Sequence, residues 1–419
     1  MSNTPAIVFF LSSEWSRYHR PGLLRAVARA CAPEQAVLVV NNPVCLTTSR
    51  WQRPDRWDAW KAGLEKSRIT EVAPNLMLLD TAVALHDKLA DALPGASALN
   101  RRLLRVQVGR GLRHLNMSTQ RVSWFQFPTF HHYPGLLGEA LAIYECYDEH
   151  AELPGLSARA SARLVALEQK LMHRCDLVFT TSKPLFDLRR EQHANVALTY
   201  NGADLDFFAP VAQTSLQTPT QRSAKSPTVG YLGTIHAHTD LAVLATMARR
   251  CPSWRFVLIG PVQVDADDVS LAALRAAPNV ALHGWVDDAQ LVMLLKTIDV
   301  GVIPYCAEAR FNRFVNPNKL HEYTAMGKPV VASPGLDLTS HLGCPSGAVS
   351  VACGADEFIA AIEAEHATNS VLKVQQRLQT AAENTWDARA RLMLRHIMRT
   401  LESKAQATTP SFNTAGHAP

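Results

Sequence analysis

Lys319 and Glu322 are the residues whose types and spacing most directly suggest chemistry. A helix over residues 317–326 is predicted, because Asn316 can cap its start and Gly327 can end it. Both side chains would then project from one face of that helix. A lysine beside the positive end of the helix dipole is favourable only if an anion binds there, and a carboxylate one turn further on can accept hydrogen bonds from two hydroxyls. A nucleotide-sugar pocket requires this combination; an ordinary surface Lys–Glu pair is the alternative interpretation.

A second candidate site is the acidic pair Asp148 and Glu149. It follows residues 141–146, an apolar run that is typical of a buried strand. Enzymes with α/β folds hold their chemistry in loops beyond the carboxyl ends of strands, so a carboxylate here could act as a general base toward a hydroxyl. The alternatives are that it caps the helix that begins near residue 157, or that it faces solvent.

The first strand, predicted at residues 6–11, is also followed by a polar turn. Residues in that turn would border the ligand-binding edge of the sheet. No G-x-G-x-x-G motif occurs in the turn, which argues against a dinucleotide cofactor. The candidates for contact with a second substrate are Glu14, Tyr18, His19 and Arg20.

Strands and helices alternate through the rest of the chain, and this pattern predicts parallel sheets with helices on both faces. A length of 419 residues predicts two domains. The segment over residues 209–227 is rich in Thr, Gln, Ser and Pro and is predicted to be a linker. The expected organisation is a first domain over 1–208, the linker over 209–227, a second domain over 228–384, a helix over 385–403 and a disordered tail over 404–419.

Composition excludes several classes of protein. Hydrophobic residues make up 47% and charged residues 19%, as in a folded globular protein. No apolar run reaches the roughly 18 residues of a membrane span, and the N-terminus lacks the basic start of a signal peptide, so a cytoplasmic location is expected. The 8 cysteines are scattered without metal-ligand spacing, which predicts neither a metal site nor a disulfide framework.

The net charge of +5 is concentrated before residue 200. Such a patch could contact the phosphates of a lipid-linked acceptor or the inner face of an anionic membrane; a solvated helix face is the alternative. No aromatic-interleaved or named nucleic-acid motif accompanies it, so nucleic acid is not an expected partner. Its densest part comprises Arg101, Arg102, Arg105, Arg110 and Arg113.

The segments VGYLGTIHAHTDL, NVALHGWVDDAQLVMLLKTIDVGVIPY and NPNKLHEYTAMGKPVVAS resemble, in this order, the donor-binding lobe of bacterial GT-B glycosyltransferases that make cell-surface polysaccharides. EWSRYHRPGLLRAVA and IYECYDEHAELPG are similar to segments of the first lobe in that family. The resemblance covers most of residues 7–402. It implies two Rossmann-like, doubly wound domains facing across a cleft, with the nucleotide-sugar donor in the second, the acceptor in the first, and the helix over 385–403 returning to the first.

The same resemblance implies roles for individual residues. Asp148 matches an acidic residue that is a candidate base. The nucleotide sugar is a co-substrate, and neither a further cofactor nor a metal is expected, because fixed positive groups would stabilise the leaving diphosphate. The implied donor contacts are Gly233 and Thr234 in a phosphate loop, His236 beside it, Asn318, Lys319 on the diphosphate and Glu322 on the ribose.

Two departures from the family pattern bear on mechanism. Phe314 stands where many retaining relatives carry a second glutamate, and Glu145 and Glu149 stand where aspartate is usual. The first departure weakens a retaining assignment, while Asp148 keeps an inverting mechanism open. The predicted function is hexosyl transfer from a nucleotide-diphosphate sugar to a hydroxyl of a glycan or lipid-linked acceptor. A nucleotide-sugar epimerase on the same fold and a non-catalytic nucleotide-sugar-binding protein are the alternatives.

Overall fold

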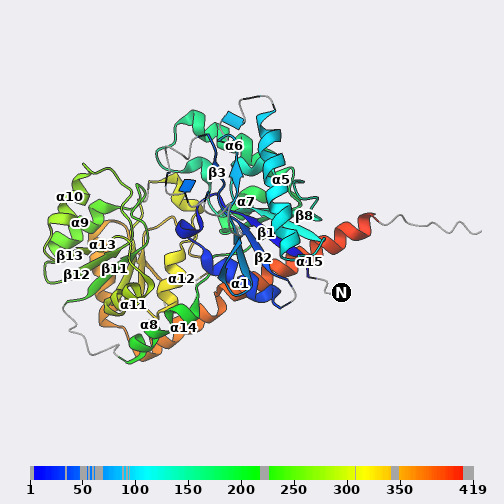
Figure 1. Cartoon of the computed structure of the whole chain (residues 1–419). Coiled ribbons are helices and arrows are strands. Elements are labelled where there is room, and N and C mark those ends of the chain that lie inside the picture. Colours follow the sequence, from blue (N-terminus) through cyan, green and yellow to red (C-terminus); the bar gives the residue numbers. More distant parts are fainter. Residues whose placement is uncertain are drawn as a thin grey trace, which may run out of the picture.

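The computed structural model consists of two lobes, each built around a parallel sheet (Figure 1). It describes residues 4–33, 35–47, 54, 57, 58, 61, 69–86, 89, 90, 93, 95–217, 226–306, 308–340 and 349–408. Consecutive strands within each lobe are joined mostly through helices, as the alternating sequence pattern predicts.

The sheet of the first lobe contains eight strands in the order β10-β9-β8-β7-β1-β2-β5-β4. All neighbouring pairs are parallel except β4 and β5. The strands are β1 (Ala6–Phe10), β2 (Val37–Val40), β4 (Ile69–Ala73), β5 (Leu76–Leu79), β7 (Arg121–Phe125), β8 (Leu141–Cys146), β9 (Leu177–Thr180) and β10 (Val196–Leu198). A separate two-stranded sheet pairs β3 (Val44–Cys45) with β6 (Ala82–Val83).

Helices cover both faces of this sheet, which is why its central strands are apolar along their whole length. β1, β2, β8 and β9 are buried at every position. One face carries α5 (Ala96–His114), α6 (Ala158–Met172) and α7 (Lys183–Arg190), and the other carries α1 (Pro21–Cys31) and α15 (Trp386–Thr408). Figure 1 shows the red α15 running under the first lobe beside α1.

The second lobe has a six-stranded sheet in the order β13-β12-β11-β14-β15-β16, with every pair parallel. Its strands are β11 (Thr228–Leu232), β12 (Arg255–Ile259), β13 (Val280–Leu282), β14 (Val300–Ile303), β15 (Val330–Ala332) and β16 (Val349–Val351). Its helices are α8 (Leu205–Gln217), α9 (Leu241–Arg250), α10 (Val269–Ala276), α11 (Asp288–Thr297), α12 (Asn318–Ala325), α13 (Gly354–Ala367) and α14 (Val371–Glu383).

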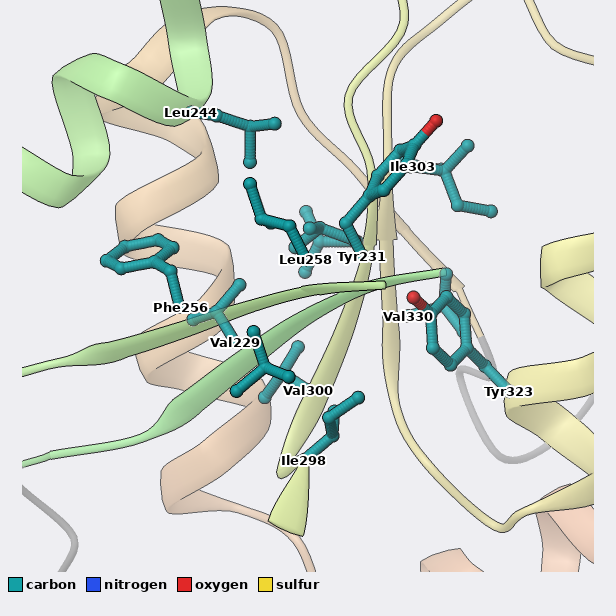
Figure 2. Close-up of a cluster of buried hydrophobic side chains, with 14 of the residues drawn as sticks. Val229, Tyr231, Leu244, Phe256, Leu258, Ile298, Val300, Ile303, Tyr323 and Val330 are labelled. Carbon is teal, nitrogen blue, oxygen red and sulfur yellow. The ribbon is translucent and has the colours of Figure 1, made fainter. Parts of the chain in front are cut away.

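Close packing of α12 on this sheet places the Lys319–Glu322 face. Figure 2 shows Tyr323 of this helix beside the strands of the sheet. The Tyr323 ring lies over Gly301 of β14, where an added Cβ would stand 2.6 Å from the ring. The Tyr323 hydroxyl donates a hydrogen bond of 2.8 Å to the carbonyl oxygen of Gly230 in β11. Two central strands therefore fix the position of α12, and glycine at residue 301 permits this close approach.

The chain crosses between the lobes twice, and the two crossings pair with each other. Ala203 and Thr385 form a parallel bridge. The amide of Ala203 donates to the Asn384 carbonyl at 3.1 Å, and the amide of Trp386 donates to the Ala203 carbonyl at 3.1 Å. The helix that follows the second crossing, α15, then packs in the core of the first lobe.

Two segment predictions require correction. The linker expected over residues 209–227 is helical as far as Gln217, because Phe208 and Val211 give α8 an apolar side that is buried in the second-lobe core. The tail expected from residue 404 is helical as far as Thr408. The remaining parts of both predictions, residues 218–225 and 409–419, lie outside the described residues.

Candidate functional site

The start of α12 has no side-chain cap. The helix begins at Asn318, and its N-cap residue Pro317 has no side chain that could satisfy the first amides. The cap predicted for Asn316 is wrong, because the side-chain oxygen of Asn316 accepts from His321 at 2.8 Å instead. The side-chain oxygen of Asn318 is buried without a hydrogen-bond partner among the described residues.

Lys319 lies in this first turn and points toward the loop after β11. Its ammonium donates to the Tyr305 hydroxyl at 2.9 Å and lies 5.1 Å from the centre of the Tyr231 ring. Burial opposes the charge, but the Tyr231 and Tyr305 hydroxyls and Glu322 favour it, and the balance raises the pKa of Lys319. The ammonium group is therefore held charged while it donates to a neutral hydroxyl.

Glu322 is half-buried one turn further along α12, and its side-chain carboxylate makes no hydrogen bond to any described residue. Burial raises the pKa of its carboxyl group, and Lys319 partly offsets that effect. A carboxylate that is partly desolvated and unpaired gains most when hydroxyl donors approach it. The geometry suits the recognition of a diol.

The backbone after β11 closes against Lys319. Gly233 has a φ of +107°, and a Cβ there would lie 3.0 Å from the Lys319 ammonium. A Cβ on Gly260, which has a φ of +137°, would lie 2.4 Å from the Gly233 carbonyl oxygen. The structure therefore brings Gly233 and Lys319 together, as predicted, and adds Gly260, whose role no motif indicated.

Thr234 and His236 continue this loop and are both half-buried. The Thr234 carbonyl accepts from the Tyr231 hydroxyl at 2.8 Å. Burial lowers the pKa of His236, and the charge of Lys319 lowers it further. The His236 ring stacks 4.9 Å from His238, a neighbour that sequence reasoning missed.

Helix α9, which follows the loop after β11, differs from α12 at its N-terminus. The Asp240 carboxylate accepts a hydrogen bond of 3.0 Å from the Val243 amide, so a side chain of the protein already caps that terminus. Helices α6, α7, α10, α11 and α14 are also capped by a side chain at their N-cap residue. Because the first turn of α12 lacks such a cap, it can accept an anion at lower cost.

In the first lobe, Asp148 lies in the loop directly after β8 and is half-buried. Burial raises the pKa of Asp148 to about 7; the neighbouring charge of Glu149 also raises it, and Arg20 lowers it. A carboxyl group that titrates near neutrality can accept a proton from a substrate hydroxyl and release it again.

The four residues predicted to contact an acceptor lie at different depths. Glu14 is half-buried, and His19 is exposed beside Tyr147, with ring centres 5.2 Å apart. Tyr18 and Arg20 are 7% and 2% exposed, so direct acceptor contact through these two side chains is not supported.

Arg20 and Tyr18 belong to a buried network beneath the loop. Arg20 forms an ion pair of 2.7 Å with Glu145. Glu145 also accepts from the Gln126 amide at 2.8 Å, and Gln126 donates to the Tyr18 hydroxyl at 2.8 Å. The sequence did not reveal this network because its members come from three segments that are distant along the chain.

The two lobes meet at His19. Enclosure lowers the pKa of His19, although solvent still reaches its ring. Positive charges on both sides lower it further, namely Arg20 in its own lobe and His236 and Lys319 in the other. The loop after β1 therefore faces the start of α12, and the candidate residues of the two lobes share one region.

Several solved structures share the fold of this chain. The fold is similar to sucrose-phosphate synthase from Thermosynechococcus elongatus, with a TM-score of 0.66 and 16% identity over 95% of this chain and 99% of that chain. It is also similar to Anabaena Alr3699/HepE in complex with UDP, with a TM-score of 0.61 and 14% identity over 95% and 100% of the two chains. Residues 226–364 match the family model described as glycosyl transferases group 1. This chain therefore has the GT-B fold, and its residues 226–364 are similar to glycosyl transferases group 1.

A curated relative of this GT-B protein is the putative teichuronic acid biosynthesis glycosyltransferase TuaH of Bacillus subtilis (strain 168). The two are 28% identical over 235 residues, which are 53% of this chain and 57% of the relative. The match thus spans little more than half of either protein. The predicted fold class and the predicted resemblance to bacterial glycosyltransferases are confirmed.

Phe314, which the resemblance places at the position of a second glutamate, packs against the first lobe. Phe314 is half-buried against the core of the first lobe, and the Arg313 guanidinium lies 5.5 Å from its ring centre. Nearby, Asn316 accepts from the Asn201 amide at 3.1 Å, and Asp337 accepts from the Lys183 amide at 2.6 Å. These contacts join the second lobe to the first.

Proposed function

We propose that this GT-B protein transfers a sugar from a nucleotide-diphosphate sugar to a hydroxyl group of a glycan or lipid-linked acceptor in surface-polysaccharide synthesis. The observation that carries the proposal is the uncapped first turn of α12, where Lys319 lies against Gly233 and faces the first lobe. A cation, free amides and a glycine turn together suit a diphosphate. TuaH, which resembles this chain over part of its length, is named as a glycosyltransferase of teichuronic acid biosynthesis.

The donor is proposed to bind along α12. The diphosphate lies between Lys319, the first amides of α12 and the backbone of Gly233 and Thr234. The ribose hydroxyls donate to Glu322, whose carboxylate has no hydrogen-bond partner among the described residues. His236 and Asn318 border the same site, and the unpartnered oxygen of Asn318 can accept one more donor hydrogen bond.

In the transfer step, the carboxylate of Asp148 removes the proton of an acceptor hydroxyl as its oxygen forms a bond to the anomeric carbon. The bond between that carbon and the diphosphate oxygen breaks, and the nucleoside diphosphate leaves with the electron pair. Lys319 and the amides of α12 stabilise the new negative charge. We assign no cofactor to this step, because these fixed groups supply the positive charge that a metal ion would supply elsewhere.

The acceptor is proposed to enter from the first lobe past Glu14 and His19. Tyr18 and Arg20 support this surface from below, as their burial indicates. The inner face of a membrane is the proposed source of a lipid-linked acceptor, so the protein would act in the cytoplasm. No helix of the described residues is long and apolar enough to span a membrane.

Helix α5 is the proposed membrane contact. Arg102, Arg105, Arg110 and Arg113 are exposed on it, and the exposed Leu99 and Val106 lie among them. Mixed basic and apolar side chains on one helix face suit an anionic lipid surface. Arg101 does not belong to this face, because it donates to the His132 carbonyl.

A screen of nucleotide sugars tests the donor proposal directly. A UDP- or GDP-sugar that binds the folded state should raise the melting temperature, and by more in the wild-type protein than in Glu322→Ala. Incubation of the bound donor with and without glycan or lipid-linked acceptors then distinguishes the activities. Transfer requires an acceptor, whereas a new sugar isomer from donor alone would indicate an epimerase, and binding without turnover a binding protein.

A further inference from the structure

Arg189 of α7 connects the Asp148 loop to the helix behind it. Its guanidinium donates to the Glu149 carboxylate at 2.7 Å and to the Glu168 carboxylate of α6 at 2.8 Å, and all three side chains are buried. Glu168 also accepts from the Tyr144 hydroxyl of β8 at 2.6 Å. One cation therefore joins α6, α7 and the end of β8.

The main chain on both sides of Asp148 is tied down by neighbouring side chains. The Thr181 hydroxyl donates to the Tyr147 carbonyl at 2.8 Å. The Cys146 thiol donates to the Asp148 carbonyl at 3.6 Å. Arg189 holds Glu149. Contacts with neighbouring side chains therefore fix three consecutive residues, Tyr147, Asp148 and Glu149.

The same contacts determine the charge beside Asp148. Burial raises the pKa of Glu149, and Arg189 counteracts this by lowering it. The charge that Glu149 keeps adds to burial in raising the pKa of Asp148. Without the Arg189 charge, the buried carboxyl groups of Glu149 and Glu168 would lie together without a cation, and they would take up a proton.

We infer that Arg189 is a positioning residue: it fixes the loop that carries Asp148 and maintains a negative charge on Glu149 beside that carboxyl group. The inference rests on the proposed function only in taking Asp148 as the base. Arg189 acts through Glu149 and is not assigned a contact with substrate.

The expected consequences differ from those of a purely structural residue. Loss of the Glu149 charge should lower the pKa of Asp148, since a like charge nearby disfavours ionisation. The other groups that affect Asp148 or its loop stay in place: Arg20 before α1, which lowers the pKa of Asp148, and the neutral rings of His19, Tyr147 and His150. A structural defect alone would reduce activity without lowering the pKa of Asp148.

The experiment is a pH titration of the Asp148 carboxyl carbon by NMR in full-length protein labelled with ¹³C at the aspartate carboxyl. The signal is assigned by its loss in Asp148→Asn. The titration is repeated in Arg189→Met, Arg189→Lys, Glu149→Gln and Glu168→Gln. Circular dichroism and a melting curve for each variant establish that it is folded.

The midpoint of the Asp148 pH titration should fall by about half a pH unit or more in Glu149→Gln and Arg189→Met. Arg189→Lys, which retains the cation, and Glu168→Gln, which retains the Arg189–Glu149 pair, should keep the wild-type midpoint. The same midpoint in wild type and in folded Glu149→Gln would overturn the inference, even if Arg189→Met does not fold. The NMR titration does not depend on catalytic activity. Unimpaired sugar transfer by Asp148→Asn would therefore refute the role of Asp148 as base but would leave the inference about Arg189 and Glu149 standing.

Discussion

Both lobes bring cations together with carboxylates, but they leave them in different states. In the second lobe, Lys319 donates to a neutral hydroxyl, and the Glu322 carboxylate has no hydrogen bond to any described residue. In the first lobe, Arg189 is shared by two buried carboxylates at 2.7 and 2.8 Å. Arg20 likewise forms a buried ion pair with Glu145.

This difference separates groups available to a ligand from groups that support the fold. A buried ion pair has already exchanged its water for protein partners, so it gains little from a substrate. The partly desolvated Lys319 and Glu322 have lost water without gaining an ionic partner at hydrogen-bond distance, and a diphosphate and a diol would supply one for each. Asp148 is intermediate, because it is half-buried next to the paired groups.

The largest expected effect concerns the paired groups of the first lobe. Arg20→Met should lower the free energy of unfolding by about 3–5 kcal/mol, because Glu145 would remain buried without its cation. Chemical denaturation measures this change. The matched control is Arg29→Met, which breaks the exposed Arg29–Asp387 pair and should cost less than about 1 kcal/mol. Equal losses in the two variants would contradict the distinction between buried and exposed pairs.

Asp148→Asn should reduce sugar transfer by roughly two orders of magnitude or more, because a general base is lost, while the Kd for the donor changes little. In the wild-type protein, kcat/KM should rise with pH through about 7 as Asp148 ionises. Steady-state kinetics over pH 5–9, with donor Kd from calorimetry, test both. Near-normal turnover in the variant would remove Asp148 from the mechanism.

The same variant should change how stability depends on pH. The folded-state pKa of Asp148 is raised to about 7, so the wild-type protein loses stability as pH rises from the unfolded pKa of about 4 through 7. The side-chain amide introduced by Asp148→Asn does not ionise, so the variant escapes that loss. Asp148→Asn should therefore melt higher than wild type at pH 8, with a smaller difference at pH 5; an equal difference at both pH values would argue against the raised pKa.

Glu322→Ala should weaken donor binding about tenfold while the free energy of unfolding changes by less than about 1 kcal/mol, because no hydrogen bond to a described residue is lost. Glu322→Gln should bind with intermediate affinity, since an amide oxygen still accepts one hydroxyl. Calorimetric titration with the nucleotide diphosphate and with the matching 2′,3′-dideoxy nucleotide measures the ribose contribution. An unchanged Kd would remove Glu322 from the donor site.

A separate effect, on binding to membranes, is expected on the surface of α5. Arg102→Glu with Arg105→Glu should weaken binding to vesicles of anionic phosphatidylglycerol by about 1 kcal/mol for each arginine removed. Arg249→Glu with Arg255→Glu, both exposed in the second lobe, makes the same charge change elsewhere. Vesicle sedimentation at several salt concentrations measures the difference; equal losses would indicate an effect of net charge alone.

Much of the fold could be predicted from local patterns. The strands predicted at residues 6–11 and 141–146 were recognisable because strands buried on both faces are continuously apolar, and β1 and β8 lie there. Residues 209–217 were misjudged because their polar composition concealed the buried Val211, which continues the apolar side of α8 that Phe208 begins. Composition averages over a segment, whereas burial depends on which face each side chain occupies.

In the candidate site, too, local features could be predicted from the sequence and tertiary contacts could not. The sequence by itself predicted that Lys319 and Glu322 lie on one helix and that Asp148 follows a strand, because a helix period and the end of a strand are local features. Only the tertiary structure decided that Asn316 is not the helix cap, that Arg20 and Tyr18 lie beneath the surface, and that Arg189 holds Glu149. Those outcomes depend on contacts between residues far apart in the chain, and such contacts determine desolvation, pairing and hence which charged groups remain available to a ligand.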